Sequence, residues 1–383
     1  MNRYMSFLLP LLGGFLFYSC SNQGSHALSF QVTERDTLYT CDFAAVPDEE
    51  KQIKLSDLIE SFQIVRFENV DSALFKTRKV YISANYIGIL QGGGSPFKLF
   101  NHEGNFLCDV GGIGQAEGEY TSLYSAAINE KDASIWLAPF VGTHLWKYNM
   151  EGKCVSTVKT LPMNKPSMRF EKDSSLTMTD LYFTNRSGFL YLRLLKNDSI
   201  YYSVAEKEHS YSPYNAEGNF TGCNQEIWFY NNSERFTYMT TYSDTLYTYD
   251  LKEDRTKPRF VTTFQRDQKH FLVYNELPSS FLINVIGFGD DNDSKLIIAD
   301  KMSGEASCVK IYNDFMGNLP VSSFNPSNGW YHRMYEPIEL IELLEKQLSN
   351  KECSKQDRAK LKELLSSIDE NDNNIMFMGK LAK

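Results

Sequence analysis

The stretch from Phe97 to Tyr120 reads FKLFNHEGNFLCDVGGIGQAEGEY and carries the pattern that decides the fold. It holds two short apolar runs joined by a Glu-Gly turn, followed by a glycine-rich connector that ends in an aromatic residue. Its segment 100–107, FNHEGNFL, matches YNMEGKCV at 148–155 in residue type, 48 residues later. An internal repeat of about 20–50 residues is typical of solenoids and propellers.

The aromatic residue of this repeat recurs along the chain, each time near the end of a strand-like run, at Phe100, Tyr148, Tyr202, Tyr249 and Tyr312. The spacings are 48, 54, 47 and 63 residues. A further copy is expected at the front, because DTLY at 36–39 repeats DTLY at 244–247 and places Cys41 at the marker position. Six units of about 50 residues would use nearly the whole chain after its N-terminal segment.

Each unit contains short β-type runs bounded by turn residues. The first unit has runs at 79–83, 86–90, 97–100 and 105–110, and the second has runs at 124–128, 134–138, 144–149 and 153–159. Gly104 and Gly152 follow Glu at hairpin tips, where a positive φ favours glycine. Four short strands per repeat predict an all-β fold, a six-bladed β-propeller of four-stranded blades over residues 29–383.

The connector at 111–120, GGIGQAEGEY, precedes an apolar strand and then SIWLA at 134–138, and it resembles the NHL-type repeat. More narrowly, the chain resembles a family of six-bladed β-propeller lipoproteins of Gram-negative envelopes, whose connector reads Gly-Gln-Gly-Pro-Gly-Glu-aromatic. Ala116-Glu117 stand where that family has Gly-Pro, and Asn374 replaces an expected proline. The resemblance implies a fold and an envelope location and no established catalytic residues. On this interpretation Gly111, Gly114, Gly118 and Tyr120 form the passage from one blade to the next.

Residues 1–19 read as a bacterial lipoprotein signal peptide. Arg3 supplies the positive end, an apolar run follows to Tyr18, and Ser19 precedes Cys20, the expected site of lipid attachment. The apolar run is shorter than the roughly 20 residues that span a bilayer as a helix. A plain secretory signal is the alternative. Residues 20–28 would form a tether to the membrane, and the periplasmic face of the outer membrane is preferred over the cell surface because no acidic cluster follows Cys20.

The composition limits the partners and the redox chemistry. A net charge of −9 argues against nucleic acid as a partner. Six further cysteines are scattered without CxxC spacing. Pairing is possible in an oxidising compartment, but a chain of this length does not need disulfides, so buried free thiols are expected for most of them. These residues are Cys41, Cys108, Cys154, Cys223, Cys308 and Cys353.

The sequence contains no recognisable cofactor, metal or nucleophile motif. The glycines at 112–118 do not give GxGxxG and no Lys-Ser/Thr pair follows, so a turn is preferred over a phosphate cradle. The acidic stretch 289–294 lacks the Gly and Glu of an EF-hand loop, so a hairpin tip is preferred over a calcium site. The six histidines show no HExxH spacing, and no GxSxG is present. A site assembled across blades would leave no local motif.

Two helices are expected at about 336–368. Pro337 suits a first turn, with Ile338, Ile341, Leu344 and Leu348 on one face, and Ser354 and Asp357 have capping-box spacing. Packing against the propeller rim is preferred over binding a partner. The run at 375–378 would return as a strand and close the ring with the N-terminal segment.

The function predicted from these features is a non-catalytic envelope protein that binds a glycan, a peptide or a protein partner. The alternative is a hydrolase or lyase acting on an envelope or dietary polymer at the propeller axis. Histidines and carboxylates that converge on the axial cavity with perturbed pKa values would favour catalysis. If the connector touches ligand, Gln115, Glu117 and Glu119 are the expected contacts.

Overall fold

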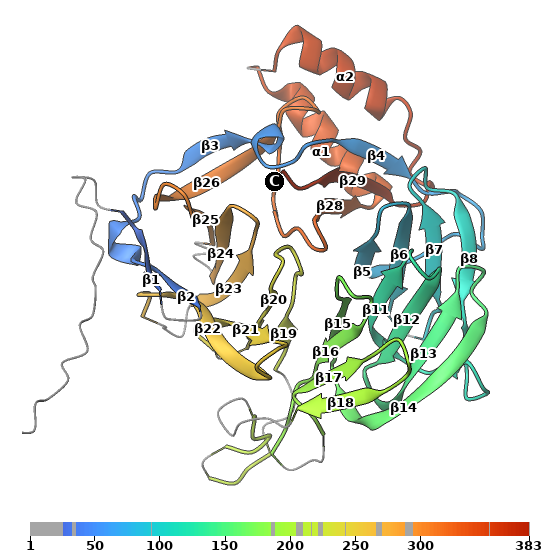
Figure 1. The fold of residues 1–383 in the computed structure, drawn as a ribbon. Coiled ribbons are helices and arrows are strands. Elements are labelled where there is room, and N and C mark those ends of the chain that lie inside the picture. The colour runs from blue at the N-terminus through green and yellow to red at the C-terminus, as the bar shows by residue number, and fades with distance from the viewer. Residues whose placement is uncertain are drawn as a thin grey trace, which may run out of the picture.

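The computed structural model describes residues 26–32, 36–92, 94–184, 188–203, 210–215, 217–220, 225–241, 243–265, 270–287, 294–351 and 353–382. Over these residues the chain forms a six-bladed β-propeller (Figure 1). The predicted fold class is therefore confirmed. The signal peptide, Cys20 and most of the tether lie outside the described residues, as do Cys223 and most of the acidic stretch 289–294.

The first three blades are regular four-stranded antiparallel sheets. Blade I contains β5(Thr77–Ile82), β6(Tyr86–Gln91), β7(Phe97–Asn101) and β8(Phe106–Val110). Blade II contains β11(Leu123–Asn129), β12(Ser134–Pro139), β13(Val141–Asn149) and β14(Cys154–Asn164). Blade III contains β15(Ser167–Phe170), β16(Leu176–Thr179), β17(Tyr191–Leu194) and β18(Ile200–Ser203). The short strands β9(Gly112–Ile113) and β10(Glu119–Tyr120) pair within the connector from blade I to blade II.

Blades IV and V receive additional strands from the N-terminal segment. Blade IV contains β19(Ile227–Trp228), β20(Phe236–Thr240), β21(Thr245–Asp250) and β22(Arg255–Thr262), and β22 is followed at the outer edge by β2(Thr37–Cys41) and β1(Leu28–Val32). Blade V contains β23(His270–Glu276), β24(Ser280–Gly287), β25(Lys295–Asp300) and β26(Ala306–Asn313), and β26 pairs with β3(Lys51–Lys54) and β27(Leu319–Pro320). Two short 3-10 turns, η1(Phe43–Ala45) and η2(Leu55–Asp57), follow β2 and β3.

Blade VI closes the ring by joining the two ends of the chain. Its strands are β28(Trp330–Tyr335), β29(Ile375–Lys380) and β4(Gln63–Arg66), in that order outward from the axis. Val65 of β4 lies opposite Met376 of β29 in an antiparallel pair. The expected return of residues 375–378 as a strand is thus observed, and this pairing leaves no open ring.

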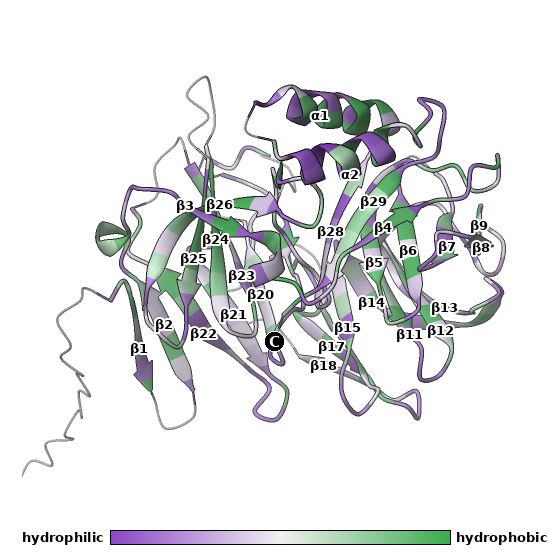
Figure 2. Ribbon diagram, turned by 90° about the horizontal axis from the view of Figure 1, so that it is seen from above, coloured by the Kyte–Doolittle hydropathy of each residue, from purple (hydrophilic) through white to green (hydrophobic). Residues whose placement is uncertain are grey.

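The helices α1(Pro337–Ser349) and α2(Lys355–Leu365) stand between β28 and β29 in the chain and lie outside the ring (Figures 1 and 2). They pack against blade VI, since Leu340, Leu344 and Leu361 are buried in one cluster with Phe377. The predicted face of α1 is partly wrong: Ile338 is 54% exposed, because the docked face is centred on Leu340 and Leu344. Ser354 caps α2 by accepting a hydrogen bond from the backbone of Asp357. No helix of the described chain is long and apolar enough to cross a membrane.

The repeat marks strands at two different positions of the blade. Phe100, Tyr148 and Tyr249 lie on third strands, as the alignment implies, whereas Tyr202 and Tyr312 lie on the fourth strands β18 and β26. The front copy is also wrong as a blade, because β2 is an added strand that runs parallel to β22. Edge strands and third strands share the same apolar alternation, so the sequence pattern does not separate them.

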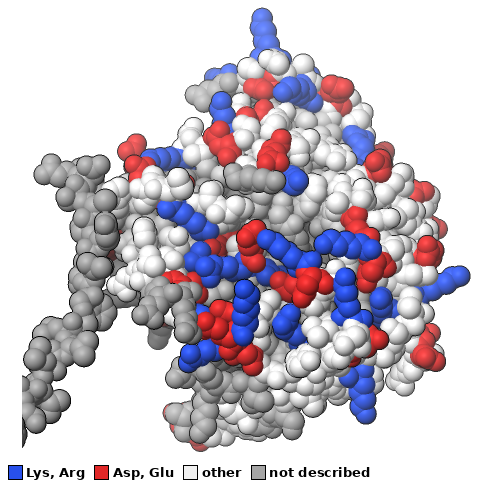
Figure 3. Space-filling model, in the orientation of Figure 1, with Lys and Arg blue, Asp and Glu red and all other residues white. Residues whose placement is uncertain are grey.

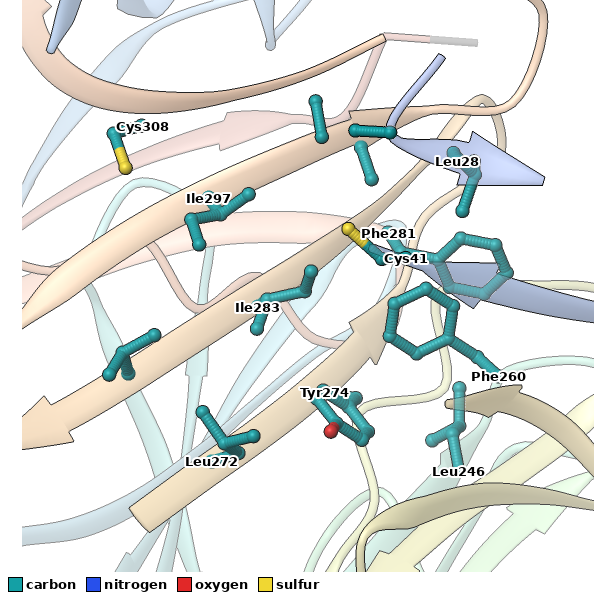
Figure 4. Close-up of a cluster of buried hydrophobic side chains, with 14 of the residues drawn as sticks. Leu28, Cys41, Leu246, Phe260, Leu272, Tyr274, Phe281, Ile283, Ile297 and Cys308 are labelled. Carbon is teal, nitrogen blue, oxygen red and sulfur yellow. The ribbon is translucent and has the colours of Figure 1, made fainter. Parts of the chain in front are cut away.

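The core fills the spaces between neighbouring blades. Figure 4 shows the cluster between blades IV and V. Its buried residues come from nine strands. Figure 2 shows that the apolar stripes follow the strands. In this cluster the rings of Phe260 and Phe281 stack at 4.3 Å between centroids. Cys41 and Cys308 are buried free thiols here, whereas Cys108 and Cys353 are free thiols that are only partly buried, so burial of most of the cysteines is not observed among the described residues. Cys154 is an exposed free thiol, contrary to the burial expected for most of the cysteines, because it stands on the outermost strand β14.

The blade I to II connector acts as a packed turn. Gly111 and Gly118 adopt φ of +69° and +75°. The hydroxyl of Tyr120 donates to the carbonyl of Val110 (2.5 Å) and accepts from the amide of Phe97 (2.9 Å). The side chain of Tyr120 is buried among residues of both blades. The connector therefore fixes the passage between two blades.

Candidate functional site

A pocket of about 670 Å³ lies on the axis of the ring. Its walls come from the innermost strands of blades I to IV, from residues 325–328 and from His332 of β28. These elements are far apart in sequence and meet because each blade places its first strand at the axis (Figure 1). A pocket of this size suits a small organic ligand.

The innermost strands present their free edges to this pocket. The strands β5, β11, β15, β19 and β28 each end the strand order of their sheet. The edge away from the sheet therefore carries backbone N–H and C=O groups that no strand pairing uses. The carbonyl of Tyr124, for example, accepts a hydrogen bond from the ammonium of Lys79. The wall thus offers main-chain donors and acceptors in addition to side chains.

A charged cluster occupies the end of the pocket where the innermost strands begin. The ammonium of Lys79 lies 3.8 Å from the ring centroid of Tyr124 and 3.2 Å from its carbonyl oxygen. The hydroxyl of Tyr124 donates to Oε2 of Glu226, and the ammonium of Lys165 lies 2.5 Å from Oε1 of Glu226. Arg78 sits beside this group, 5.6 Å from the Tyr124 ring centroid. Figure 3 shows that charged side chains of both signs gather around the middle of one face of the ring.

Two groups of this cluster have strongly shifted pKa values. Burial lowers the pKa of Lys79 to about 8, the charges of Arg78 and Lys165 act in the same direction, and Glu226 opposes them. Burial and the hydrogen bond to Glu226 raise the pKa of Tyr124 far above its usual range. Tyr124 therefore remains a hydrogen-bond donor at neutral pH. Lys79 is a cation in an environment that favours its neutral form.

Other polar groups along the pocket have hydrogen-bonding capacity that the described protein does not use. Ser125 Oγ, Trp228 Nε1 and His332 Nδ1 are buried without a partner among the described residues. Burial lowers the pKa of His332 to about 4, so its ring is neutral at pH 7. Buried polar atoms are normally satisfied, so these atoms are available to a bound molecule or to water.

Arg169 lines the pocket but is fully engaged by the protein. Its guanidinium makes two hydrogen bonds of 2.9 Å to the carboxylate of Glu171. It also donates to Asn231 Oδ1 at 3.0 Å and to the carbonyl of Arg235 at 2.8 Å. This arrangement ties blade III to blade IV and neutralises the cation. Arg169 is thus a structural part of the wall and is not free to bind an anion.

A second cavity of about 510 Å³ adjoins the first and is lined by blades IV and V and by residues 320–325. It shares Trp228, Tyr230 and Asn325 with the axial pocket. Among the described residues, no group of three or more His, Cys, Asp or Glu is placed to hold a metal ion.

The connector residues predicted as ligand contacts lie elsewhere. Gln115 and Glu117 are exposed, and the carboxylate of Glu119 accepts the backbone amide of Ala116 at 2.9 Å. None of the three is among the residues that line the axial pocket. A ligand role for them stays a prediction that the pocket does not support.

The residues of the axial cluster were not singled out by the sequence. Lys79, Tyr124, Lys165 and Glu226 stand on four separate segments, and each reads locally as a polar residue near the start of a strand. The Arg78-Lys79 pair at the beginning of an innermost strand is the single local signal. The Arg78-Lys79 pair lies close to Glu226 only because the blades are arranged in a ring.

Comparisons with known proteins agree with the fold. No curated protein matches the chain. A Bacteroides fragilis protein described as exported has a TM-score of 0.63 at 15% identity, over 90% of this chain and 100% of its own. A member of the DUF4221 family from Bacteroides vulgatus has a TM-score of 0.46 at 8% identity, over 85% of this chain and 98% of its own. At 15% identity the likeness to the Bacteroides fragilis protein concerns the fold alone.

The family model described as "Domain of unknown function (DUF4934)" matches residues 38–380, from the strand β2 to the end of the closing strand β29. The match includes every blade and both helices. The chain therefore belongs to the DUF4934 family.

Proposed function

We propose that this protein is a non-catalytic binding protein of the cell envelope that holds a small ligand in its axial pocket. The observation that carries the proposal is the pocket of about 670 Å³, walled by five blades and equipped with a charged cluster at one end. Pockets with a few convergent polar groups and shifted pKa values are the usual sites of ligand binding. The proposed binding function also includes the binding of a peptide or a protein partner at the rim of the propeller.

The carboxylates of the pocket favour binding over hydrolysis. Glycoside hydrolysis commonly uses two carboxyl groups on either side of the scissile bond. Among the described lining residues, Glu226 supplies the single carboxylate, and both of its oxygens are engaged by Tyr124 and Lys165. His332 is not hydrogen-bonded to it in the described chain. The convergent His and carboxylate pair that would favour hydrolysis is not formed here.

A screen of ligand classes tests the proposal directly. The full chain would be incubated with panels of oligosaccharides, peptides and divalent metals, and its melting temperature would be recorded with each. We expect at least one saccharide or peptide class to raise the melting temperature in proportion to the logarithm of its concentration above Kd. No stabilisation by any member of the panels would contradict the proposal.

One observation favours a second candidate, a polysaccharide lyase. Burial lowers the pKa of Lys79 to about 8, which suits a general base near neutral pH. Lys79 would take the proton from the carbon next to a uronate carboxylate, and the electron pair of that C–H bond would form a carbon–carbon double bond to the neighbouring carbon. The glycosidic C–O bond on that neighbouring carbon would break, its electron pair would leave on the oxygen, and this oxygen would take a proton from water. Incubation of the full chain with uronate polymers, followed by ultraviolet absorbance of the unsaturated product, tests this candidate. No absorbance above that of the Lys79→Met variant would exclude it.

We also propose that a lipid on Cys20 anchors the protein to the envelope, preferably at the periplasmic face of the outer membrane. The N-terminal segment supports this, with an apolar run followed by Ser19-Cys20. The similarity in fold to the Bacteroides fragilis protein described as exported supports export from the cytoplasm. Cys20→Ala is expected to release the protein from the membrane fraction. Unchanged membrane association of this variant would refute the anchor.

A further inference from the structure

We propose that the ligand of the axial pocket is an acidic saccharide, whose carboxylate is held by Lys79 and Arg78. This inference rests on the proposed binding function and adds the chemical class of the ligand. Its basis is the count of charges at one end of the pocket and the neutral polar groups along the rest of it.

The charges of the cluster do not balance. Glu226 is the one carboxylate of the described lining, and it pairs with Lys165 at 2.5 Å while its other oxygen accepts the hydroxyl of Tyr124. Both oxygens are thus committed. Lys79 and Arg78 form no ion pair with a carboxylate of the described chain. Two cations therefore remain unneutralised at the same end of the pocket.

Lys79 is the more informative of the two cations because it is largely enclosed. Its ammonium contacts the carbonyl and the ring of Tyr124. An ammonium has three N–H donors, so donor capacity remains on the pocket side. Removing a charge from water costs free energy unless a partner compensates. Burial accordingly lowers the pKa of Lys79 to about 8, and a bound anion would offset that cost.

The remainder of the pocket suits hydroxyl groups. Asn231, Asn325 and Asn328 line it, and the amide of Asn231 donates to Asn328 Oδ1 at 2.8 Å. Amide side chains offer both donors and acceptors. Ser125, Trp228 and His332 add buried polar atoms without partners in the described chain. Together with the partly buried ring of Trp228, these groups fit a sugar ring that carries many hydroxyls.

The pocket thus has a cationic end and, along the rest of its wall, neutral polar side chains set among apolar residues. A sugar bearing one carboxylate matches both parts. A peptide with a free carboxyl end would match the cationic end, but its apolar side chains would face the unpartnered polar atoms. A metal ion would meet two unneutralised cations. The saccharide is therefore the occupant that the described groups favour.

An array experiment separates charge from sugar recognition. The full chain would be applied to oligosaccharides bearing uronate or sialate carboxylates and to the same set after methyl esterification, with neutral oligosaccharides alongside. We expect binding to members of the acidic set and a loss of at least about tenfold on esterification, as for a charge-assisted hydrogen bond. Equal binding of the esterified set would overturn the inference, as would stabilisation by peptides or inorganic phosphate alone.

The best acidic ligand would then be titrated calorimetrically into the wild type, Lys79→Met and Lys147→Met. Lys147 is a matched control, because it also lies over an aromatic ring, that of Trp136 at 5.6 Å, but on β13 away from the axial pocket. We expect Lys79→Met to weaken binding by at least about tenfold and Lys147→Met to leave it unchanged. Wild-type affinity in Lys79→Met would overturn the inference. Arg78→Met, at an exposed side chain, provides a second variant if Lys79→Met fails to fold.

These experiments test the acidic ligand separately from the proposed binding function. Binding of neutral or esterified saccharides in the axial pocket would leave the binding function standing and refute the acidic ligand. Absence of binding to every array, including the neutral one and the peptide panel, would contradict both.

Discussion

Lys79 is held in the wall of the axial pocket without a carboxylate partner in the described chain. Its pKa is about 8 in the folded protein and 10.5 in its ordinary state. Between these values the unfolded chain binds a proton that the folded protein has released, so this residue makes stability rise with pH. At pH 7 both states are protonated and the folded protein carries the full cost of the buried charge.

Lys79→Met is therefore expected to unfold at a higher denaturant concentration than the wild type at pH 7. This advantage should shrink as pH rises through 8 toward 10.5, because the wild-type lysine then becomes neutral. Urea denaturation of both proteins at several pH values between 7 and 10 measures it. A difference that stays constant over this range would show that Lys79 is not a costly buried cation.

His332 is expected to make the stability of the protein depend on pH in the acidic range. Its pKa is about 4 in the folded protein and 6.5 ordinarily, because burial disfavours the charged ring. As pH falls from 6.5 to 4 the unfolded chain gains a proton that the folded protein refuses, so stability declines. We expect His332→Gln to reduce this decline by roughly 1–3 kcal/mol. Denaturation at pH 7 and pH 4.5 measures it, with His144→Gln at an exposed position as the control. An unchanged decline would contradict the buried neutral ring.

At the scale of elements, a hairpin tip of the form Asn-x-Glu-Gly recurs three times. The tips at Gly104, Gly152 and Gly218 have φ of +90°, +75° and +82°. In each the Asn side chain accepts the amide of the residue after the glycine, at 2.8, 2.9 and 2.8 Å. The third copy lies in a connection and no blade repeat predicted it. This four-residue sequence therefore forms the same turn inside and outside the blades.

Gly152 and Gly218 separate backbone strain from contact between blades. A Cβ at Gly152 would lie 2.1 Å from the carbonyl oxygen of Asp109 in blade I, whereas a Cβ at Gly218 would meet nothing within 4 Å. We expect Gly218→Val to cost about 1–3 kcal/mol through its positive φ alone. Gly152→Val should lower the free energy of unfolding by more than that, because blade I must also move. Equal costs in urea denaturation would indicate that the tip does not bear on the neighbouring blade.

The sequence predicts strands better than their positions in a blade. The runs at 97–100 and 134–138 match β7 and β12 within a residue, because their apolar residues and bounding turns are both present. The marker tyrosines Tyr202 and Tyr312 fall on fourth strands, and Cys41 falls on an added edge strand. A strand has the same period wherever it stands in a sheet. Its neighbours are decided by pairing over long distances, which local pattern does not record.

At the scale of the whole molecule, ring closure determines both stability and the site. The pairing of β4 with β29 joins residues 63–66 to residues 375–380, and the helices enter between β28 and β29 without interrupting the ring. The closure was predictable from the returning apolar run near the C-terminus. The axial cluster was not, because Lys79 and Glu226 become neighbours only when four blades have been placed around the axis. No segment of the sequence contains enough of the site to show its chemistry.

The most direct test of the account is to block the axial pocket and measure binding. Ser327 lines the pocket on a loop, so Ser327→Trp would fill part of the space, whereas Ser156→Trp on the outermost strand β14 introduces the same ring away from it. The dissociation constant of the best ligand from the screen would be measured for both variants and the wild type. Binding in the axial pocket predicts at least a tenfold loss for Ser327→Trp, equivalent to about 1.4 kcal/mol, and no change for Ser156→Trp. Unchanged affinity in a folded Ser327→Trp variant would contradict the account.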